Sequence, residues 1–223
     1  MDYWAQKTVS MYRIVFLSSC IFLLAHCISK QKTSLLPYYN TPDFTPHFLT
    51  ANEAKTAITH SIADFSCTDQ DGKNITQQIV YGKIHVANFF FTACGSICPK
   101  MMSNLKDAYA AFKNDTSLVF LSYSVTPWKD SVQKLKAYAE NNAMNFTNWH
   151  LLTGNKGDIY KLARTSYFAE EDFGFSRDSS QFLHTEHILL IDKNKKIRGI
   201  YNGTLQLETE QLAKDIAVLK KEG

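Results

Sequence analysis

The chain lacks the features that mark several large classes of protein. Its 223 residues include only five cysteines, too few to build a disulfide scaffold. The net charge is +3 without a concentrated basic stripe, so nucleic acid is not an expected partner. The apolar run at 14–28 is shorter than the roughly 20 residues of a membrane-spanning helix. With 45% hydrophobic and 20% charged residues, the composition is that of an ordinary globular domain.

The apolar run near the N-terminus predicts an export signal. It follows Lys7 and Arg13, as the h-region of a secretory signal does. Residues 23–27 resemble a bacterial lipoprotein processing site, in which Cys27 becomes the lipidated first residue. Cys20 has a shorter apolar lead-in, and an uncleaved anchor helix is the main alternative. Each version predicts an extracytoplasmic domain tied to a membrane, on the periplasmic side of a bacterial inner membrane.

Three segments are expected along the chain. Residues 1–28 form the signal or anchor, and residues 29–60, polar and proline-bearing, form a tether. The compact domain is expected at 61–223, in line with about 150 residues per domain. It opens with a strand at 62–67 and the turn signal Asp71-Gly72, which together predict a hairpin.

Strand and helix patterns alternate after this hairpin. Apolar runs predict buried strands, and apolar residues at helical spacing predict helices. The predicted strands are 86–91, 118–121, 149–152, 188–192 and 197–201, and helices follow the first strand and begin near 130, 156 and 209. The last two strands should pair as a hairpin. This order predicts a three-layer α/β domain, with a central mixed sheet flanked by helices.

A close cysteine pair is the most informative motif. Cys94 and Cys98 are separated by three residues, and Pro99 follows at once. A strand is expected to end before them and a helix to begin after them, so both sulfurs should lie at a helix N-terminus, which favours thiolates. Thiolates serve both soft metals and disulfide exchange. Cys67 alternates like a strand residue and is expected to be an inert buried thiol.

A histidine far along the chain is the candidate third ligand. His187 stands where a loop enters the penultimate predicted strand, which we expect beside the cysteine turn. Two thiolates and an imidazole suit Cu(I). His184 is an alternate ligand. Met102 lies at helical spacing and is expected to pack in the core.

Taken together, these motifs resemble those of the Sco/SenC family. The resemblance covers about residues 60 to 220 and rests on Phe91-Thr92-x-Cys94-x-x-x-Cys98-Pro99, Ser124 to Asp130, Leu151 to Gly154, and Glu186-His187. Departures from the family pattern are Gly95-Ser96 for Pro-Asp, Thr126 for an acidic residue, and Glu186 for Asp.

The resemblance implies a fold and a function. Sco/SenC proteins are thioredoxin-like copper proteins that help to assemble the binuclear copper centre of cytochrome c oxidase. It implies a thioredoxin-like fold with an N-terminal hairpin extension, copper as the bound metal, and Cys94, Cys98 and His187 as its ligands. The implied partner is the copper-bearing oxidase subunit.

Three functions compete at this point. The first is a membrane-tethered copper metallochaperone. The second is a thiol-disulfide oxidoreductase in which Cys94 and Cys98 form the redox pair. Such reductases usually have two residues between their cysteines, so the third residue here favours metal. His187 discriminates the two, because metal binding needs it and disulfide exchange does not. The third is a membrane-tethered interaction domain with an inactive site.

Overall fold

A nine-stranded mixed sheet organises the chain. The computed structural model describes residues 35–144, 146–169 and 185–222, within a compact unit that begins at Leu35. The strand order is β2-β1-β9-β8-β5-β6-β7-β3-β4. The strands are β1 (Tyr38–Tyr39), β2 (Pro46–His47), β3 (Ser66–Asp69), β4 (Asn74–Thr76), β5 (Ile84–Phe90), β6 (Leu118–Ser124), β7 (Trp149–Thr153), β8 (His187–Ile191) and β9 (Ile197–Asn202).

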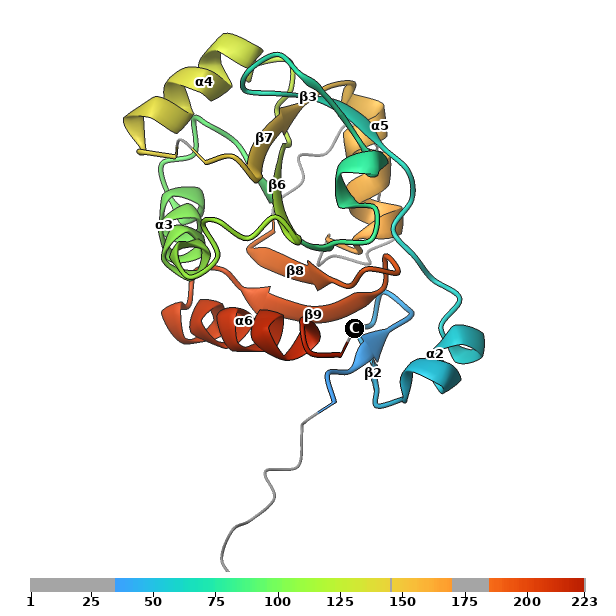
Figure 1. Cartoon of the computed structure of the whole chain (residues 1–223). Helices are drawn as coiled ribbons and strands as arrows, with labels where there is room; N and C mark the ends of the chain where they lie inside the picture. The colour runs from blue at the N-terminus through green and yellow to red at the C-terminus, as the bar shows by residue number, and fades with distance from the viewer. Residues whose placement is uncertain (1–34, 145, 170–184, 223) are drawn as a thin grey trace, which may run out of the picture. The chain divides into compact units, whose positions relative to one another are not determined.

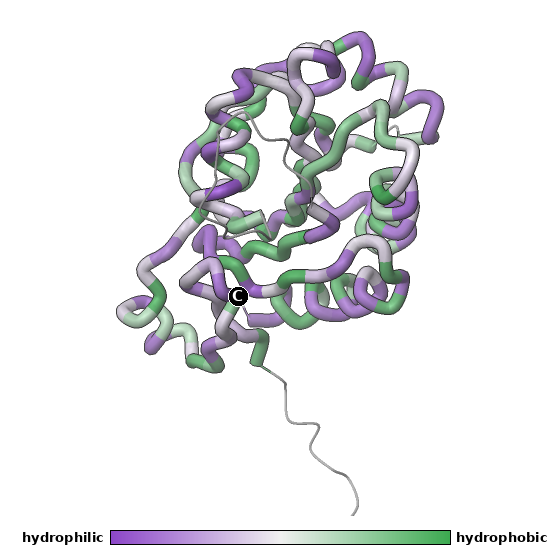
Figure 2. Tube along the Cα trace, turned by 180° about the vertical axis from the view of Figure 1, so that it is seen from behind, coloured by the Kyte–Doolittle hydropathy of each residue, from purple (hydrophilic) through white to green (hydrophobic). Residues whose placement is uncertain are grey.

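The three middle parallel strands form the centre of the domain. β5 pairs in parallel with β6, and β6 with β7, whereas β8 runs antiparallel to β5. Every residue of β5 and β6 is buried, as expected for strands that are covered on both faces. Figure 2 shows hydrophobic segments of the chain in the interior of the domain and hydrophilic segments mainly at its periphery. The helical elements are α2 (Ala51–Ala57), η1 (Gln77–Val80), α3 (Ile97–Ala110), α4 (Val132–Asn141), α5 (Lys156–Lys161), η2 (Leu162–Ser166) and α6 (Gln206–Leu219).

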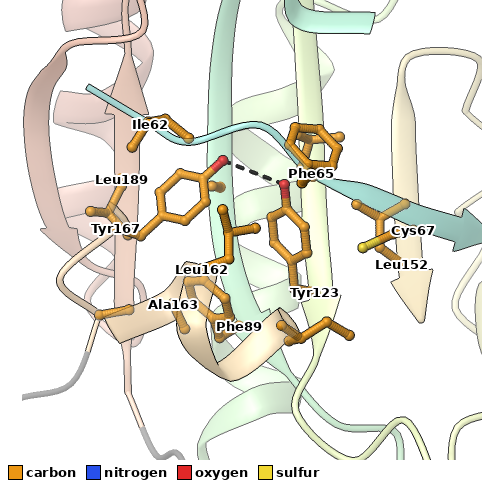
Figure 3. Close-up of a cluster of buried hydrophobic side chains, with 14 of the residues drawn as sticks. Ile62, Phe65, Cys67, Phe89, Tyr123, Leu152, Leu162, Ala163, Tyr167 and Leu189 are labelled. Carbon is orange, nitrogen blue, oxygen red and sulfur yellow. Dashed lines mark hydrogen bonds between the residues drawn. The ribbon is translucent and has the colours of Figure 1, made fainter. Parts of the chain in front are cut away.

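The helices cover the two faces of the sheet separately. On one face, α3, α4 and α6 pack over what we call the α3-side core, which includes Phe90, Cys98, Leu105, Leu151, Ile188 and Leu212. On the other face, α5, η2 and η1 pack over the α5-side core, which includes Phe65, Cys67, Phe89, Tyr123, Tyr167 and Leu189 (Figure 3). In Figure 1, α3 and α6 lie on one side of the sheet and α5 on the other. The predicted three-layer α/β architecture is therefore confirmed.

The first hairpin forms at the predicted turn. β3 and β4 pair antiparallel, and Gly72 between them has φ +77°, a conformation that residues with a Cβ rarely adopt. Cys67, in β3, is buried as expected, and burial raises the pKa of its thiol to about 11. Its thiol therefore stays protonated near neutral pH.

The tether prediction needs correction over residues 35–60. This stretch contains β1, β2 and α2, and β1 pairs with β9, so the compact unit begins earlier than residue 61. The buried Arg198 holds the segment in place by donating to the carbonyls of Leu36, at 2.9 Å, and Pro37, at 3.1 Å. The proline-bearing composition suggested a linker because none of these long-range bonds can be seen locally.

Two predictions lie outside the described residues. These are the signal or anchor at 1–28 and the start of the tether. Within the described part of the chain, no helix combines the length and apolar character needed to cross a bilayer.

A buried polar chain runs through the α5-side core. The hydroxyl of Tyr167 lies 3.4 Å from that of Tyr123 and 3.2 Å from Nε2 of His85 (Figure 3 draws the tyrosine pair). His85 is fully buried, and its Nδ1 has no hydrogen-bond partner among the described residues. Burial lowers the pKa of His85 to about 3 from an ordinary 6.5, so the folded protein holds this imidazole neutral.

We predict that His85 makes folding stability fall with acidity. Between pH 6.5 and about 3 the unfolded chain binds a proton at this residue and the folded chain does not. The contribution is complete above 6.5 and is lost as the pH falls through this window. On acidification through this window, His85→Gln should lose less unfolding free energy than the unmodified protein does, by about 1.4 kcal/mol for each pH unit. Denaturant titration at several pH values measures this. His47→Gln, on an edge strand, is the control; an unchanged slope in His85→Gln contradicts the prediction.

Candidate functional site

The cysteine pair lies at the connection between strand β5 and helix α3. β5 ends at Phe90 and α3 begins at Ile97, so Cys94 is in the connecting turn and Cys98 is in the first turn of the helix. Cys98 is 3% exposed and belongs to the α3-side core, whereas Cys94 is partly exposed at its edge. Both are free thiols. One sulfur is thus accessible from solvent and the other lies behind it.

The Cys94 sulfur takes the place of a side-chain cap on α3. Ser96 holds the N-cap position but makes no capping hydrogen bond, which leaves the first backbone N–H groups of the helix open. Pro99 has no N–H to satisfy. The backbone N–H of Cys98 donates to Cys94 Sγ at 3.4 Å. The positive end of the helix dipole is therefore directed at this sulfur.

The two thiols have opposite acidities. Burial raises the pKa of Cys94, but hydrogen bonds from the backbone of Ser96, Cys98 and Ile97 and from the Cys98 thiol outweigh it, and the net pKa is lowered. Burial raises the pKa of Cys98, and its hydrogen bond to Cys94 raises it further. Cys94 is thus the residue that ionises first, with the Cys98 thiol as its hydrogen-bond donor.

This arrangement supports two kinds of chemistry. An accessible thiolate next to a buried thiol can attack a disulfide, and the second sulfur can then resolve the mixed disulfide. The same two sulfurs, once both are deprotonated, offer a soft metal such as Cu(I) two ligands. The donor set fits copper.

His187 lies at the expected end of the sheet but faces the wrong side. It opens β8, and the pairing of Asn88 with Ile188 brings this strand end beside the end of β5. Side chains alternate along β8, with Ile188 in the α3-side core and Leu189 in the α5-side core. The His187 ring contacts the edge of Phe44, centroid to centroid 5.8 Å, and Phe44 packs on the α5-side core. The cysteines are on the α3 side.

The three predicted ligands are therefore not assembled. Among the residues that the structure describes, no group of three His, Cys, Asp or Glu side chains lies close enough to hold a metal ion. His184, the alternate ligand, falls outside the described residues. The structure brings Cys94 and Cys98 together and leaves His187 apart from them.

The methionine beside the cysteines is part of the core, as expected. Met102 is 4% exposed, and its sulfur accepts a hydrogen bond from the Asn88 side chain at 3.4 Å. Asn88 in turn accepts from the Ser122 hydroxyl at 2.6 Å. This thioether is engaged inside the domain.

Sequence reasoning missed the side chains around the pair. Tyr138, in α4, packs against Phe90, and burial followed by the nearby Cys98 and Cys94 sulfurs raises its pKa to about 12. Asp130, fully buried, accepts hydrogen bonds from Thr92 in the cysteine turn. Asp130 was visible only as the end of a motif, and Tyr138 only as an apolar position on a helix.

Three solved structures share this architecture. A SCO1/SenC family lipoprotein from Bacillus anthracis str. Ames has a TM-score of 0.63 and 30% identity, covering 73% of this chain and 96% of that one. BsSco, a Sco family cytochrome c oxidase assembly protein with a disulfide switch, has a TM-score of 0.61 and 27% identity, with coverage of 73% and 94%. ScoI of Bradyrhizobium japonicum, solved with copper bound, has a TM-score of 0.56 and 24% identity, with coverage of 72% and 99%.

The sequence comparison covers the described domain from within helix α2 almost to its end. Residues 53–221 match the SCO1/SenC family, which includes the cysteine turn, α3 and the strand that His187 opens. The thioredoxin-like fold and the free cysteine pair at the start of α3 agree with that match. The chain belongs to the SCO1/SenC family.

Proposed function

We propose that this protein binds copper as a cargo through Cys94 and Cys98 and delivers it to the copper-bearing subunit of cytochrome c oxidase. The observation that carries the proposal is the sulfur pair at the start of α3, with the Cys98 N–H on Cys94 Sγ at 3.4 Å. Family membership supports it, since ScoI is solved with copper and BsSco belongs to a family of oxidase assembly proteins.

The unequal exposure of the two sulfurs suits delivery. Cys98 is buried among apolar side chains, so a metal ion on it is shielded from water. Cys94 is partly exposed, so a sulfur or imidazole of an acceptor can approach from its side and replace it as a ligand. Stepwise ligand exchange then moves the ion without releasing it. This geometry favours transfer over permanent storage.

The third ligand is proposed to be a histidine next to β8. His187 was the choice from the sequence, but its ring contacts Phe44 on the opposite side of the sheet from the cysteines. It can join them only if it leaves this contact. His184 is the other histidine of the same segment, and we therefore give it precedence.

Thiol-disulfide exchange is the second candidate function, and the unequal acidity of the pair favours it. The Cys94 thiolate attacks one sulfur of a partner disulfide, whose other sulfur leaves as a thiolate. The deprotonated Cys98 then attacks Cys94, which forms the Cys94–Cys98 disulfide and releases the partner reduced. Two electrons pass from this protein to its partner. The disulfide switch identified in the similar protein BsSco supports this candidate.

The proposed location is the extracytoplasmic face of a membrane, on the periplasmic side of a bacterial inner membrane. The apolar segment at 14–28 and Cys27 support it, and the similar Bacillus anthracis protein is a lipoprotein. Attachment by lipid at Cys27 or by an uncleaved helix would both tether the domain.

We predict that Cys94→Ala and Cys98→Ala each raise the Cu(I) dissociation constant of the purified, reduced protein by more than about 100-fold. A lost ligand should cost more than the roughly 10- to 100-fold typical of outer contacts. Chelator competition measures this, and Cys67→Ala, which removes a buried thiol from the other core, is the matched control. Retained affinity in both variants would remove copper from the proposal.

The same competition decides the histidine. We expect His184→Ala to weaken Cu(I) binding more than His187→Ala, because the His187 side chain faces Phe44. The reverse order would show that His187 turns toward the cysteines. No effect in either variant would favour the oxidoreductase function.

We predict that oxidation and copper compete. The Cys98 thiol is hydrogen-bonded to Cys94, so the sulfurs are placed to form a disulfide, whose atoms are no longer thiolate ligands. The test is to oxidise the copper-free protein, count free thiols, and add Cu(I) before and after reduction. Equal binding by the oxidised and reduced forms would contradict the ligand assignment.

We predict that Cys27 is the lipidated residue, because a longer apolar run precedes it than precedes Cys20. Mass spectrometry of the membrane-extracted N-terminus should find a diacylglyceryl cysteine at position 27. An intact N-terminus starting at Met1 or Met11 would establish an uncleaved anchor instead.

A further inference from the structure

A carboxylate with no exposure to solvent lies behind the cysteine turn. Asp130 is 0% exposed, and four hydrogen bonds reach its two oxygens. Thr92 donates to it twice, from its hydroxyl at 2.6 Å and its backbone N–H at 3.2 Å. The hydroxyls of Ser124, at 2.6 Å, and Thr126, at 3.0 Å, complete the set.

These bonds, more than an ion pair, hold the buried charge. The ammonium of Lys134 is 4.0 Å away on a side chain that is 46% exposed, a distance at which water screens the pair. Asp130 directly precedes Ser131, the N-cap of α4, so the dipole of that helix also favours its charge. Hydrogen bonds to an ionised acceptor are the strong ones in proteins.

The donors come from two segments that are distant in sequence. Ser124 ends β6, and Thr126 follows in the connection to α4, whereas Thr92 follows β5 and opens the cysteine turn. A backbone bond from the Val125 N–H to the Phe90 carbonyl, 2.9 Å, runs alongside. Asp130 therefore joins the cysteine turn to the neighbouring strand end.

The hydrogen bonds between Thr92 and Asp130 constrain the position of the Cys94 sulfur. It is two residues from Cys94, and the Cys94 N–H closes the turn on the Phe91 carbonyl at 3.3 Å. The position of Thr92 thus sets where the turn carries Cys94 Sγ in relation to the Cys98 N–H. Among the described residues, Asp130 is the side chain that accepts hydrogen bonds from Thr92.

We propose that Asp130 is a positioning residue that, through Thr92, holds Cys94 Sγ against the start of α3. The part of the proposal that concerns copper rests on the proposed function, and the part that concerns the disulfide does not. Loss of the Thr92 hydroxyl bond lets the turn move, which weakens the N–H···S contact of the reduced pair. The reduced form loses stabilisation that the disulfide does not need, so the pair becomes harder to reduce.

The variants separate this role from simple stabilisation. Asp130→Asn disturbs the whole cluster and risks misfolding. Thr92→Val keeps the shape of the side chain and three of the four bonds to Asp130. Thr126→Val is the matched control, because it removes one hydroxyl bond to the same carboxylate and leaves both bonds from Thr92 in place. Thr92→Ser is the conservative variant, because it keeps the hydroxyl that Thr92→Val lacks.

Two measurements are made on each purified protein: the Cys94–Cys98 equilibrium with glutathione, and the Cu(I) dissociation constant. We expect Thr92→Val to shift the equilibrium about tenfold toward the disulfide, about 30 mV more negative. It should also raise the Cu(I) dissociation constant about tenfold, which is the lower end of the effect of residues that support a metal ligand without binding the metal. Thr126→Val should match the unmodified protein in both measurements despite a similar loss of unfolding free energy, and Thr92→Ser should match it in both.

The outcomes that overturn the proposal are distinct from those that overturn the function. An unshifted equilibrium in Thr92→Val, or an equal shift in Thr126→Val, removes the positioning role while copper binding by the unmodified protein still stands. An unmodified protein that binds no copper refutes the proposed function, and the glutathione equilibrium of Thr92→Val still decides the role of Asp130.

Discussion

The contact between the Cys98 N–H and the Cys94 sulfur depends on where the central strand stops. β5 is paired on both sides and fully buried, so its end at Phe90 cannot shift without disturbing two neighbouring strands. Helix α3 packs over the same strands and begins at Ile97, which leaves a short turn in which Cys94 must lie. A helix start without a side-chain cap then has open N–H groups beside a thiol. The acidity of Cys94 follows from this backbone arrangement.

The buried acidic residue serves the same turn from the other side. The N–H groups of α3 stabilise negative charge on Cys94, whereas Asp130 carries its own negative charge and holds Thr92. Hydrogen bonds satisfy the Asp130 charge locally, so the domain can keep a carboxylate close to a site that forms thiolates. Thr126 contributes a hydroxyl donor to this cluster.

The position of His187 shows how the alternation of side chains along a strand limits which residues can reach a site. The strand that His187 opens is the neighbour of β5, so its place in the sheet is suitable. Alternation along the strand sends its ring to the α5 side, where Phe44 receives it. A ligand on the α3 side has to come from a residue of the other parity or from outside the regular strand. The cysteines are on a helix and a turn, and no such alternation applies to them.

Several elements were predictable because their signals are local. Continuous apolar runs identified β5 and β6, Asp71-Gly72 identified the first hairpin, and the change from a strand pattern to a helix pattern placed Cys94 and Cys98 at the start of a helix. Contacts between residues far apart in the chain became visible only in the folded domain. Residues 35–60 join the domain through β9 and Arg198, and Asp130 meets Thr92 across 38 positions. The face of His187 also depends on strand pairing. Local patterns record how a segment buries its own side chains, whereas these contacts arise only when the sheet brings separate segments together.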